Sequence, residues 1–327
     1  MPTIKDDPKQ LEAAILDGER RIAREFRAEI AAQRASLSDD DLDAIIATGA
    51  LPADKTDNRK TIAAALAVFL LVGQKITASI EQQSGARLAF DQAESRVLIA
   101  LETTRDRLAS IYASQQARAV QAAVANAIDR GESQEATRIA VRQALGLTER
   151  LVGALVSYRR SLEAVGQKAA HTFDTMFPQV AQMIGRKNVT ADALGRALRD
   201  PGMDAAIKRA ATAGKPLPSE AIERAVQAYA DRQLAFRART IGESEAVRAV
   251  NEGAQEAWDQ AADAGVVPAS GASSSGSRGI GDNSRGRVKE TWRSQEDRKV
   301  RVSHRKCNGT QRPASGYWEA GNGPVRY

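Results

Sequence analysis

The sequence is poor in cysteine, histidine and aromatic residues. Cys307 is the only cysteine among 327 residues, so the chain can form neither an internal disulfide bond nor a zinc site built from several cysteines. The two histidines, His171 and His304, are far apart in the sequence, which argues against a site of clustered histidines. Aromatic residues make up only 4%. We therefore expect no cofactor and no metal centre, and a reducing compartment suits the chain.

The sequence also lacks a recognisable signal peptide and a long apolar run. The N-terminus, MPTIKDDPKQ, is polar and has no apolar core of the kind found in signal peptides. The longest apolar run is Ile62–Gly73. As a helix it would span about 18 Å, which is short of the roughly 30 Å hydrocarbon core of a bilayer. We interpret this run as a buried core helix; a segment that inserts into a membrane is the alternative.

Proline is absent from the 125 residues between Pro52 and Pro178, where strong helix formers such as Ala, Leu, Arg, Glu and Gln dominate. Apolar residues there recur at helical spacing. The sequence thus predicts a mainly α fold: an elongated multi-helix body of antiparallel helices joined by short connections, with a small α+β C-terminal segment. The expected helices cover about 11–30, 38–49, 61–83, 90–129, 133–145, 148–165 and 219–264. Gly242 predicts a kink or break in the last one.

Composition divides the chain into four segments. After Pro268 alanine becomes rare, glycine and serine become frequent, and Val300–Val302 suggests a short strand. We expect an N-terminal helical arm (1–55), a helical body (56–266), a Gly/Ser linker or mobile loop (267–287) and a small C-terminal segment (288–327).

The basic excess of the chain lies in its C-terminal tail, Ser270–Tyr327. This tail holds 12 Lys and Arg against 5 Asp and Glu, a balance of +7, whereas the first 269 residues have a balance of −1. Such a tail can contact nucleic acid, an acidic protein surface or anionic lipid. Its possible contacts to DNA or to a protein partner are Arg287, Lys289, Arg293, Lys299, Arg305 and Lys306.

One dense polar set occurs in the tail, and it consists of Asp297, Arg298, Arg301 and His304. An ion-paired knot that docks the tail on the body or on a partner, with Trp292 as its apolar anchor, is our main interpretation. General acid–base work on a phosphodiester and a nucleic-acid contact are the alternatives. We therefore assign no catalytic residue.

The body carries a second arginine-rich stretch. Arg237 and Arg239 lie one to two turns before Glu243 and Glu245. This spacing is typical of ion pairs on a solvated helix face, and we expect these residues to be exposed.

The sequence of the tail resembles that of a known protein family. Thr291–Ser294, Asp297–Arg298, Val300–Arg301, Ser303–His304 and Asn308–Gly309 together resemble the core pattern of the phage head-morphogenesis family, the Mu F-like minor capsid proteins. Upstream, Arg237–Ile241 with Glu245, running into Ala249 and Gly253, resembles the family's helix ahead of that core. The stretch from Leu145–Thr148 through Tyr158–Arg159 is similar to a helix common in the same family. The resemblance covers about 146–327. The chain departs from the family pattern at Ile241–Glu245, in its long Gly/Ser insertion, and by stopping at Tyr327 where members continue into a closing strand.

The resemblance implies a structural protein rather than an enzyme. It implies a virion component made in the host cytoplasm and placed inside the head near the portal vertex, where it assists assembly and, in some members, leaves with the genome. Its implied partners are the portal protein, a major capsid or scaffolding protein and packaged double-stranded DNA, with a membrane only if it is ejected and no small-molecule substrate. Two alternatives stay open: a nuclease- or transferase-type enzyme that uses Asp297 and His304, and a DNA-binding or membrane-active ejection protein.

Overall fold

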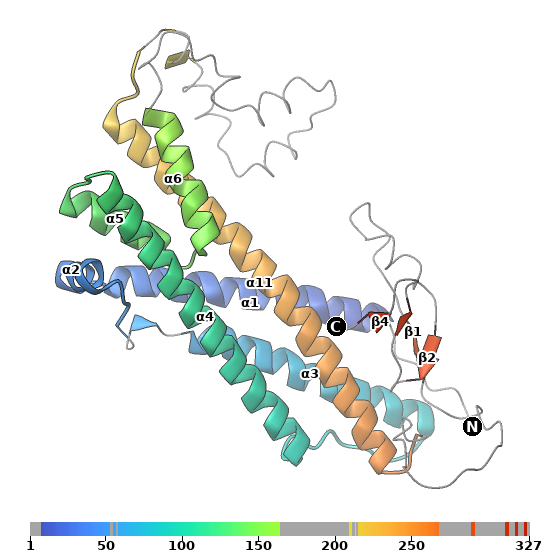
Figure 1. Ribbon diagram of the computed structural model, residues 1–327. Coiled ribbons are helices and arrows are strands. Elements are labelled where there is room, and N and C mark those ends of the chain that lie inside the picture. Colours follow the sequence, from blue (N-terminus) through green and yellow to red (C-terminus); the bar gives the residue numbers. More distant parts are fainter. Residues whose placement is uncertain are drawn as a thin grey trace. The chain divides into compact units, whose positions relative to one another are not determined.

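The computed structural model describes residues 8–52, 55–56, 58–163, 209–210, 213 and 215–267, together with short strands in the C-terminal tail. Long helices dominate these residues (Figure 1). The helices are α1 (Pro8–Ser36), α2 (Asp39–Thr48), α3 (Arg59–Ser84), α4 (Ser95–Asp129), α5 (Gln134–Ala144), α6 (Glu149–Glu163) and α11 (Ser219–Asp263). The prediction of a mainly α, multi-helix body is confirmed.

Helix ends follow local signals in the sequence. Ser38 caps α2 with a reciprocal hydrogen bond to Asp41, and Gly49 ends this helix in the left-handed conformation. Ser133 caps α5 by accepting a hydrogen bond from the Ala136 backbone amide. The short connections between these helices therefore lie where serine and glycine predict them.

The structure describes two pairs of short strands in the tail. β1 (Lys289–Thr291) pairs antiparallel with β2 (Gln311–Pro313), and β3 (Trp318–Glu319) pairs antiparallel with β4 (Pro324–Val325). The expected linker from 268 onward and the expected strand Val300–Val302 lie outside the described residues.

The chain divides into two compact units. Unit 1 comprises Met1–Ala14, Val68–Ala100 and Arg248–Tyr327, and unit 2 comprises Ile15–Ala67 and Leu101–Val247. This division differs from the four segments expected from composition. Buried side chains from the expected N-terminal arm, Phe26 and Leu42 among them, share one core with side chains of α4, α5 and α11. Residues 15–52 thus belong to the body rather than to a separate arm.

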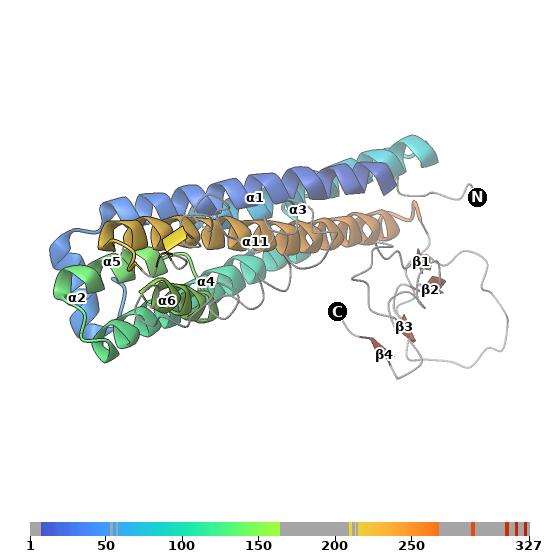
Figure 2. The same ribbon diagram turned by 90° about the horizontal axis from the view of Figure 1, so that it is seen from above.

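In unit 2, α1 and α4 both run antiparallel to α11. Glu19 of α1 lies against Gly242 of α11, and further along α1 Arg34 pairs with Asp231. On α4, Arg107 pairs with Glu245, and Gln115 bonds to Arg237. Figure 2 shows α1 and α11 running next to each other. The predicted antiparallel packing is therefore present among these helices.

In unit 1, the second half of α3 contributes buried apolar side chains. Val72 and Ile80 are almost fully buried there, and Phe69 meets the ring of Phe90 edge-on at a centroid distance of 6.5 Å. The α3–α4 connection is tied to α11 because the Gln260 side chain bonds to both the amide and the carbonyl of Asp91, at 2.8 and 3.0 Å. By length and composition α3 could cross a membrane, and 56% of its apolar window is buried inside the protein.

Gly242 does not interrupt α11, so the expected break there is wrong. The helix runs from Ser219 to Asp263 through both Gly242 and Gly253. A Cβ atom at Gly242 would lie 2.4 Å from the backbone oxygen of Glu19, and one at Gly253 would lie 2.4 Å from the backbone oxygen of Phe69. The glycines therefore allow close approach of neighbouring helices, and this packing holds α11 helical despite their low intrinsic propensity.

Candidate functional site

The site predicted in the tail falls almost wholly outside the described residues. Lys289 lies in β1, whose backbone pairs with β2. The other predicted site residues lie outside the described part of the chain: Arg287, Trp292, Arg293, Asp297, Arg298, Lys299, Arg301, His304, Arg305 and Lys306. The knot and its contacts to DNA or protein therefore stay predictions.

The body brings together Leu145–Thr148 and Arg237–Ile241, two segments that lie far apart in the sequence. The turn between α5 and α6 requires Gly146, which has a φ of 78°. A Cβ atom at this position would lie 2.7 Å from side-chain atoms of both Ile30 and Leu234. The turn is thus pressed against α1 and α11 and has no room for a side chain.

Arg237 of α11 holds this turn from inside the protein. Its Nη1 donates to the carbonyl oxygen of Gly146 at 2.7 Å, and its Nη2 donates to Gln115 Oε1 at 2.6 Å. The guanidinium stacks over the Phe26 ring at 5.4 Å from the centroid. Arg237 is only 6% exposed, and burial lowers its pKa to about 10. It stays protonated at neutral pH and acts as a buried cationic donor.

Arg34 of α1 reaches the same turn from another direction. Its Nη2 donates to the carbonyl oxygens of Gln143 and Leu145, at 3.2 and 3.0 Å, while its Nη1 pairs with Asp231 at 3.2 Å. Burial lowers the pKa of Arg34, and Asp231 opposes that shift. Arginines of α1 and α11 therefore satisfy three carbonyls at and just beyond the end of α5, those of Gln143, Leu145 and Gly146.

The exposed position expected for Arg237 is wrong. The helix turns so that Arg237 points into the core of unit 2 whereas Arg239 is exposed. Glu245 pairs across helices with Arg107 at 2.7 Å rather than along its own helix face. Arg237 lies three residues after the buried Leu234, in phase with the apolar stripe of α11, and that phase is the signal by which its burial could be predicted.

A second buried charge, Glu29 of α1, holds the start of α3. Its carboxylate accepts from the backbone amides of Lys60 and Thr61, at 2.5 and 3.0 Å, and from the Thr61 hydroxyl. Glu29 is 6% exposed. Because free amides at a helix N-terminus favour negative charge, Glu29 acts as a cap supplied by another helix.

Uncharged polar side chains complete this level of the core. Gln116 of α4 donates to Gln33 Oε1 of α1 at 2.6 Å. Three further atoms are buried without a protein partner: Tyr112 Oη, Gln116 Oε1 and Gln233 Oε1. Burial raises the pKa of Tyr112, and nearby Glu245 adds to the rise. An unsatisfied buried polar atom costs on the order of 1–3 kcal/mol, so these three atoms lower the stability of the fold.

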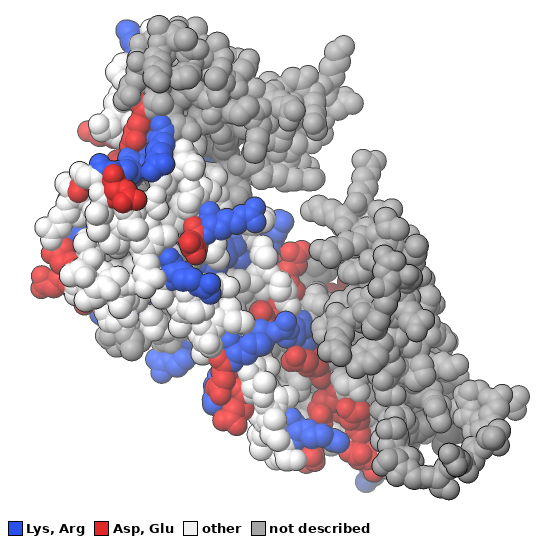
Figure 3. Space-filling model, in the orientation of Figure 1, with Lys and Arg blue, Asp and Glu red and all other residues white. Residues whose placement is uncertain are grey.

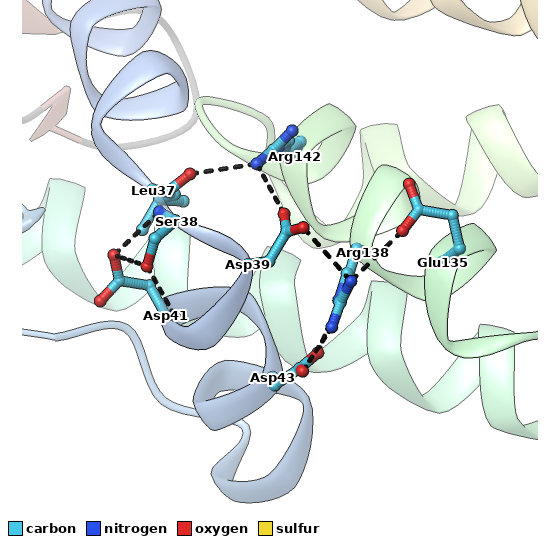
Figure 4. A network of polar contacts seen from close by, with 8 residues as sticks. All are labelled: Leu37, Ser38, Asp39, Asp41, Asp43, Glu135, Arg138 and Arg142. Carbon is cyan, nitrogen blue, oxygen red and sulfur yellow. Dashed lines mark hydrogen bonds and ion pairs between the residues drawn. The ribbon is translucent and has the colours of Figure 1, made fainter.

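A network of ion pairs links α2 to α5 at the surface of unit 2 (Figure 4). Arg138 donates to Asp43 through Nε at 2.6 Å and also contacts Asp39 and Glu135 at 3.4 Å. Arg142 donates to the Leu37 carbonyl at 3.0 Å and to Asp39 at 3.3 Å. The two arginines thus fasten the α1–α2 corner to α5.

We expect Asp43→Asn to lower stability in a pH-dependent way. Hydrogen bonds from Arg138 and Gln134 lower the pKa of Asp43 from 3.8 to about 2. Because the folded-state pKa is the lower one, the carboxylate stabilises the fold above about pH 4, and this contribution disappears as the pH falls through about 2. Urea melts of both proteins at pH 7, 4 and 2 measure the difference.

The effect should be small and sensitive to salt, because Asp43 lies near solvent. Asp40→Asn, which changes an exposed neighbour on the same helix, is the matched control. A difference between wild type and Asp43→Asn that is the same at pH 7 and pH 2 would contradict this assignment.

Many charged side chains of the described residues form ion pairs with a side chain of another helix or loop. Figure 3 shows acidic and basic side chains next to each other on the face in view. Besides the pairs above, Arg130 bonds to Glu163, Arg159 to Glu223, and Arg96 to Asp263. Among the described residues no group of three His, Cys, Asp or Glu side chains could hold a metal ion.

Comparison with known proteins gives no relative. No family model, curated protein or solved structure matches the chain.

Proposed function

We propose that this chain is a structural minor capsid protein of a tailed phage that is bound inside the head at the portal vertex and assists head assembly. The observation that carries the proposal is the direct contact between Leu145–Thr148 and Arg237–Ile241, formed by the hydrogen bond from Arg237 to Gly146. Both segments resemble the head-morphogenesis family, as does the Trp292–Gly309 pattern. These segments are 91 residues apart in the chain and meet in the folded protein, so the two stretches that carry the resemblance form one contact.

The construction of the body supports a scaffold role. Buried arginines and Glu29 bind backbone groups at helix ends, and partly buried arginines such as Arg107 and Arg159 pair with carboxylates of neighbouring helices. In the described residues these charged groups serve helix packing. The proposed role of the body is to carry the basic tail, which would dock on the portal protein.

The proposal is tested by deleting 287–327 in a phage that encodes this chain. Purified heads are then analysed for the chain by quantitative mass spectrometry. We expect incorporation to fall at least about tenfold, because Trp and Arg side chains typically dominate protein interfaces and most of the basic excess would be lost. The control is Arg239→Ala, which removes an exposed charge from the body and should leave incorporation unchanged.

Three outcomes separate the proposal from its alternatives. Truncated chain at normal copy number in heads would contradict docking through the tail. Loss of the chain from heads after nuclease treatment, with steep salt dependence, would favour binding to DNA. A purified chain that cleaves nucleic acid, and loses this activity with His304→Ala at an unchanged melting temperature, would favour the enzyme.

A further inference from the structure

Many of the apolar side chains that α11 buries in unit 2 are small. Such side chains discriminate only weakly between one register of α11 and another. In unit 2, four of the seven buried hydrophobic residues of α11 are alanines: Ala225, Ala230, Ala238 and Ala246. A methyl group fills little of the space between helices, so helices that pack through alanine can shift by one turn and bury similar surface. Gly242 opposes such a shift, because Ala238 or Ala246 would then lie at the close contact with Glu19. The buried polar side chains of unit 2 provide a second constraint on the register.

The buried polar side chains of unit 2 occur in pairs on three neighbouring helices. Three helices each supply two of them, four residues apart, so each pair lies on one helix face. They are Glu29 and Gln33 on α1, Tyr112 and Gln116 on α4, and Gln233 and Arg237 on α11, and all are 6% exposed or less. We call these six side chains the polar layer.

A shift of α11 by one turn would break the contacts of the polar layer. It would move Arg237 about 5.4 Å along the helix axis, away from the Gly146 carbonyl and from Gln115. A leucine-sized side chain in the place of Arg237 would lose no such bond on shifting. Single buried polar residues fix register in this way in coiled coils, at a cost in stability.

We propose that the polar layer fixes the register of α11 against α1 and α4. Arg237 contributes most to the preference for the observed register over a shifted one, because it binds the backbone carbonyl of Gly146, which it can reach only in the observed register. The unpartnered atoms of Tyr112, Gln116 and Gln233 are the cost of this selection. The role is independent of any binding partner and of the proposed function.

The register is measured directly by the distance between spin labels on α1 and α11. Labels are attached at Arg24→Cys and Arg224→Cys, both exposed positions in unit 2, in a Cys307→Ser background. In the wild-type layer we expect one narrow distance distribution. In an apolar layer with Gln33→Leu, Tyr112→Phe, Gln116→Leu, Gln233→Leu and Arg237→Leu, we expect a second population displaced by about 5 Å, one helical turn.

A control variant distinguishes the effect of removing the polar layer from the effect of removing any buried polar group. Thr77→Val removes a hydroxyl in unit 1 that is also buried without a partner, and it should leave the label distance unchanged. If the full variant does not fold, the pair Gln233→Leu and Arg237→Leu is measured by the same criterion. A single, unshifted distance in a folded variant would overturn the proposal. Loss of folding in both variants would assign the layer to stability instead, and this would overturn it too.

Discussion

The substitution Gly242→Ala should destabilise the protein by about 2 kcal/mol, although alanine favours helix over glycine by about 1 kcal/mol. The added Cβ atom would lie 2.4 Å from the backbone oxygen of Glu19 and 3.3 Å from the Ala23 side chain. A backbone carbonyl of α1 cannot rotate away as a side chain could, so α1 and α11 must separate. Overpacking of this kind typically costs about 1–3 kcal/mol, and it also loosens the contacts around the new atom.

Gly153→Ala is the matched control for this prediction. Gly153 lies in α6 and has no neighbouring atom within 4 Å of an added Cβ. The same chemical change should therefore stabilise the protein by about 0.5–1 kcal/mol. Urea denaturation followed by circular dichroism measures both variants. If both changed stability in the same direction, the close approach of α11 to α1 at Gly242 would be refuted.

We expect Arg237→Ala to destabilise the protein by about 3 kcal/mol. The change removes two hydrogen bonds from a charged donor, each worth about 1.5–3 kcal/mol, and leaves the Gly146 carbonyl without that partner. It also removes the stem that packs on Phe26. Relief of the buried positive charge offsets part of this loss, because burial disfavours the charged form of Arg237.

The control is Arg239→Ala, two residues along the same helix. Arg239 is exposed, so its removal should change stability by less than about 0.5 kcal/mol. Arg237→Lys tests the geometry of the contact, because an ammonium cannot reproduce the planar fork that reaches Gly146 and Gln115 together. Thermal melts compare the three variants, and equal losses for Arg237→Ala and Arg239→Ala would show that the Gly146 contact carries little energy.

Local sequence signals were enough to place the helices of the body. Capping serines, terminating glycines and apolar spacing predict α2, α5 and α6 to within about two residues, because these signals act over only a few residues. The prediction of a break at Gly242 is wrong because it uses the same local signals, which do not include contacts with other helices. A glycine in a helix looks destabilising until the neighbouring helix that needs the space is known.

The buried charges could not be assigned from local pattern alone. Glu29 and Arg237 lie in phase with apolar stripes, which is a usable signal, but their partners are backbone groups at Lys60 and Gly146. Backbone groups carry no residue-specific signal in the sequence, so only the fold reveals these contacts. The tail site rests on the Trp292–His304 pattern, and those residues lie outside the described part of the chain.

The division into two units has a practical consequence for any dissection of this protein. The boundaries after Ala14, Ala67, Ala100 and Val247 all fall inside helices, within α1, α3, α4 and α11. A shortened gene that ends at one of them would leave broken helices with apolar faces exposed. Neither unit can therefore be expressed alone as a continuous piece, and insertions or permuted termini are best placed in the turns at Gly49, Gly85 and Gly131, where no helix is cut.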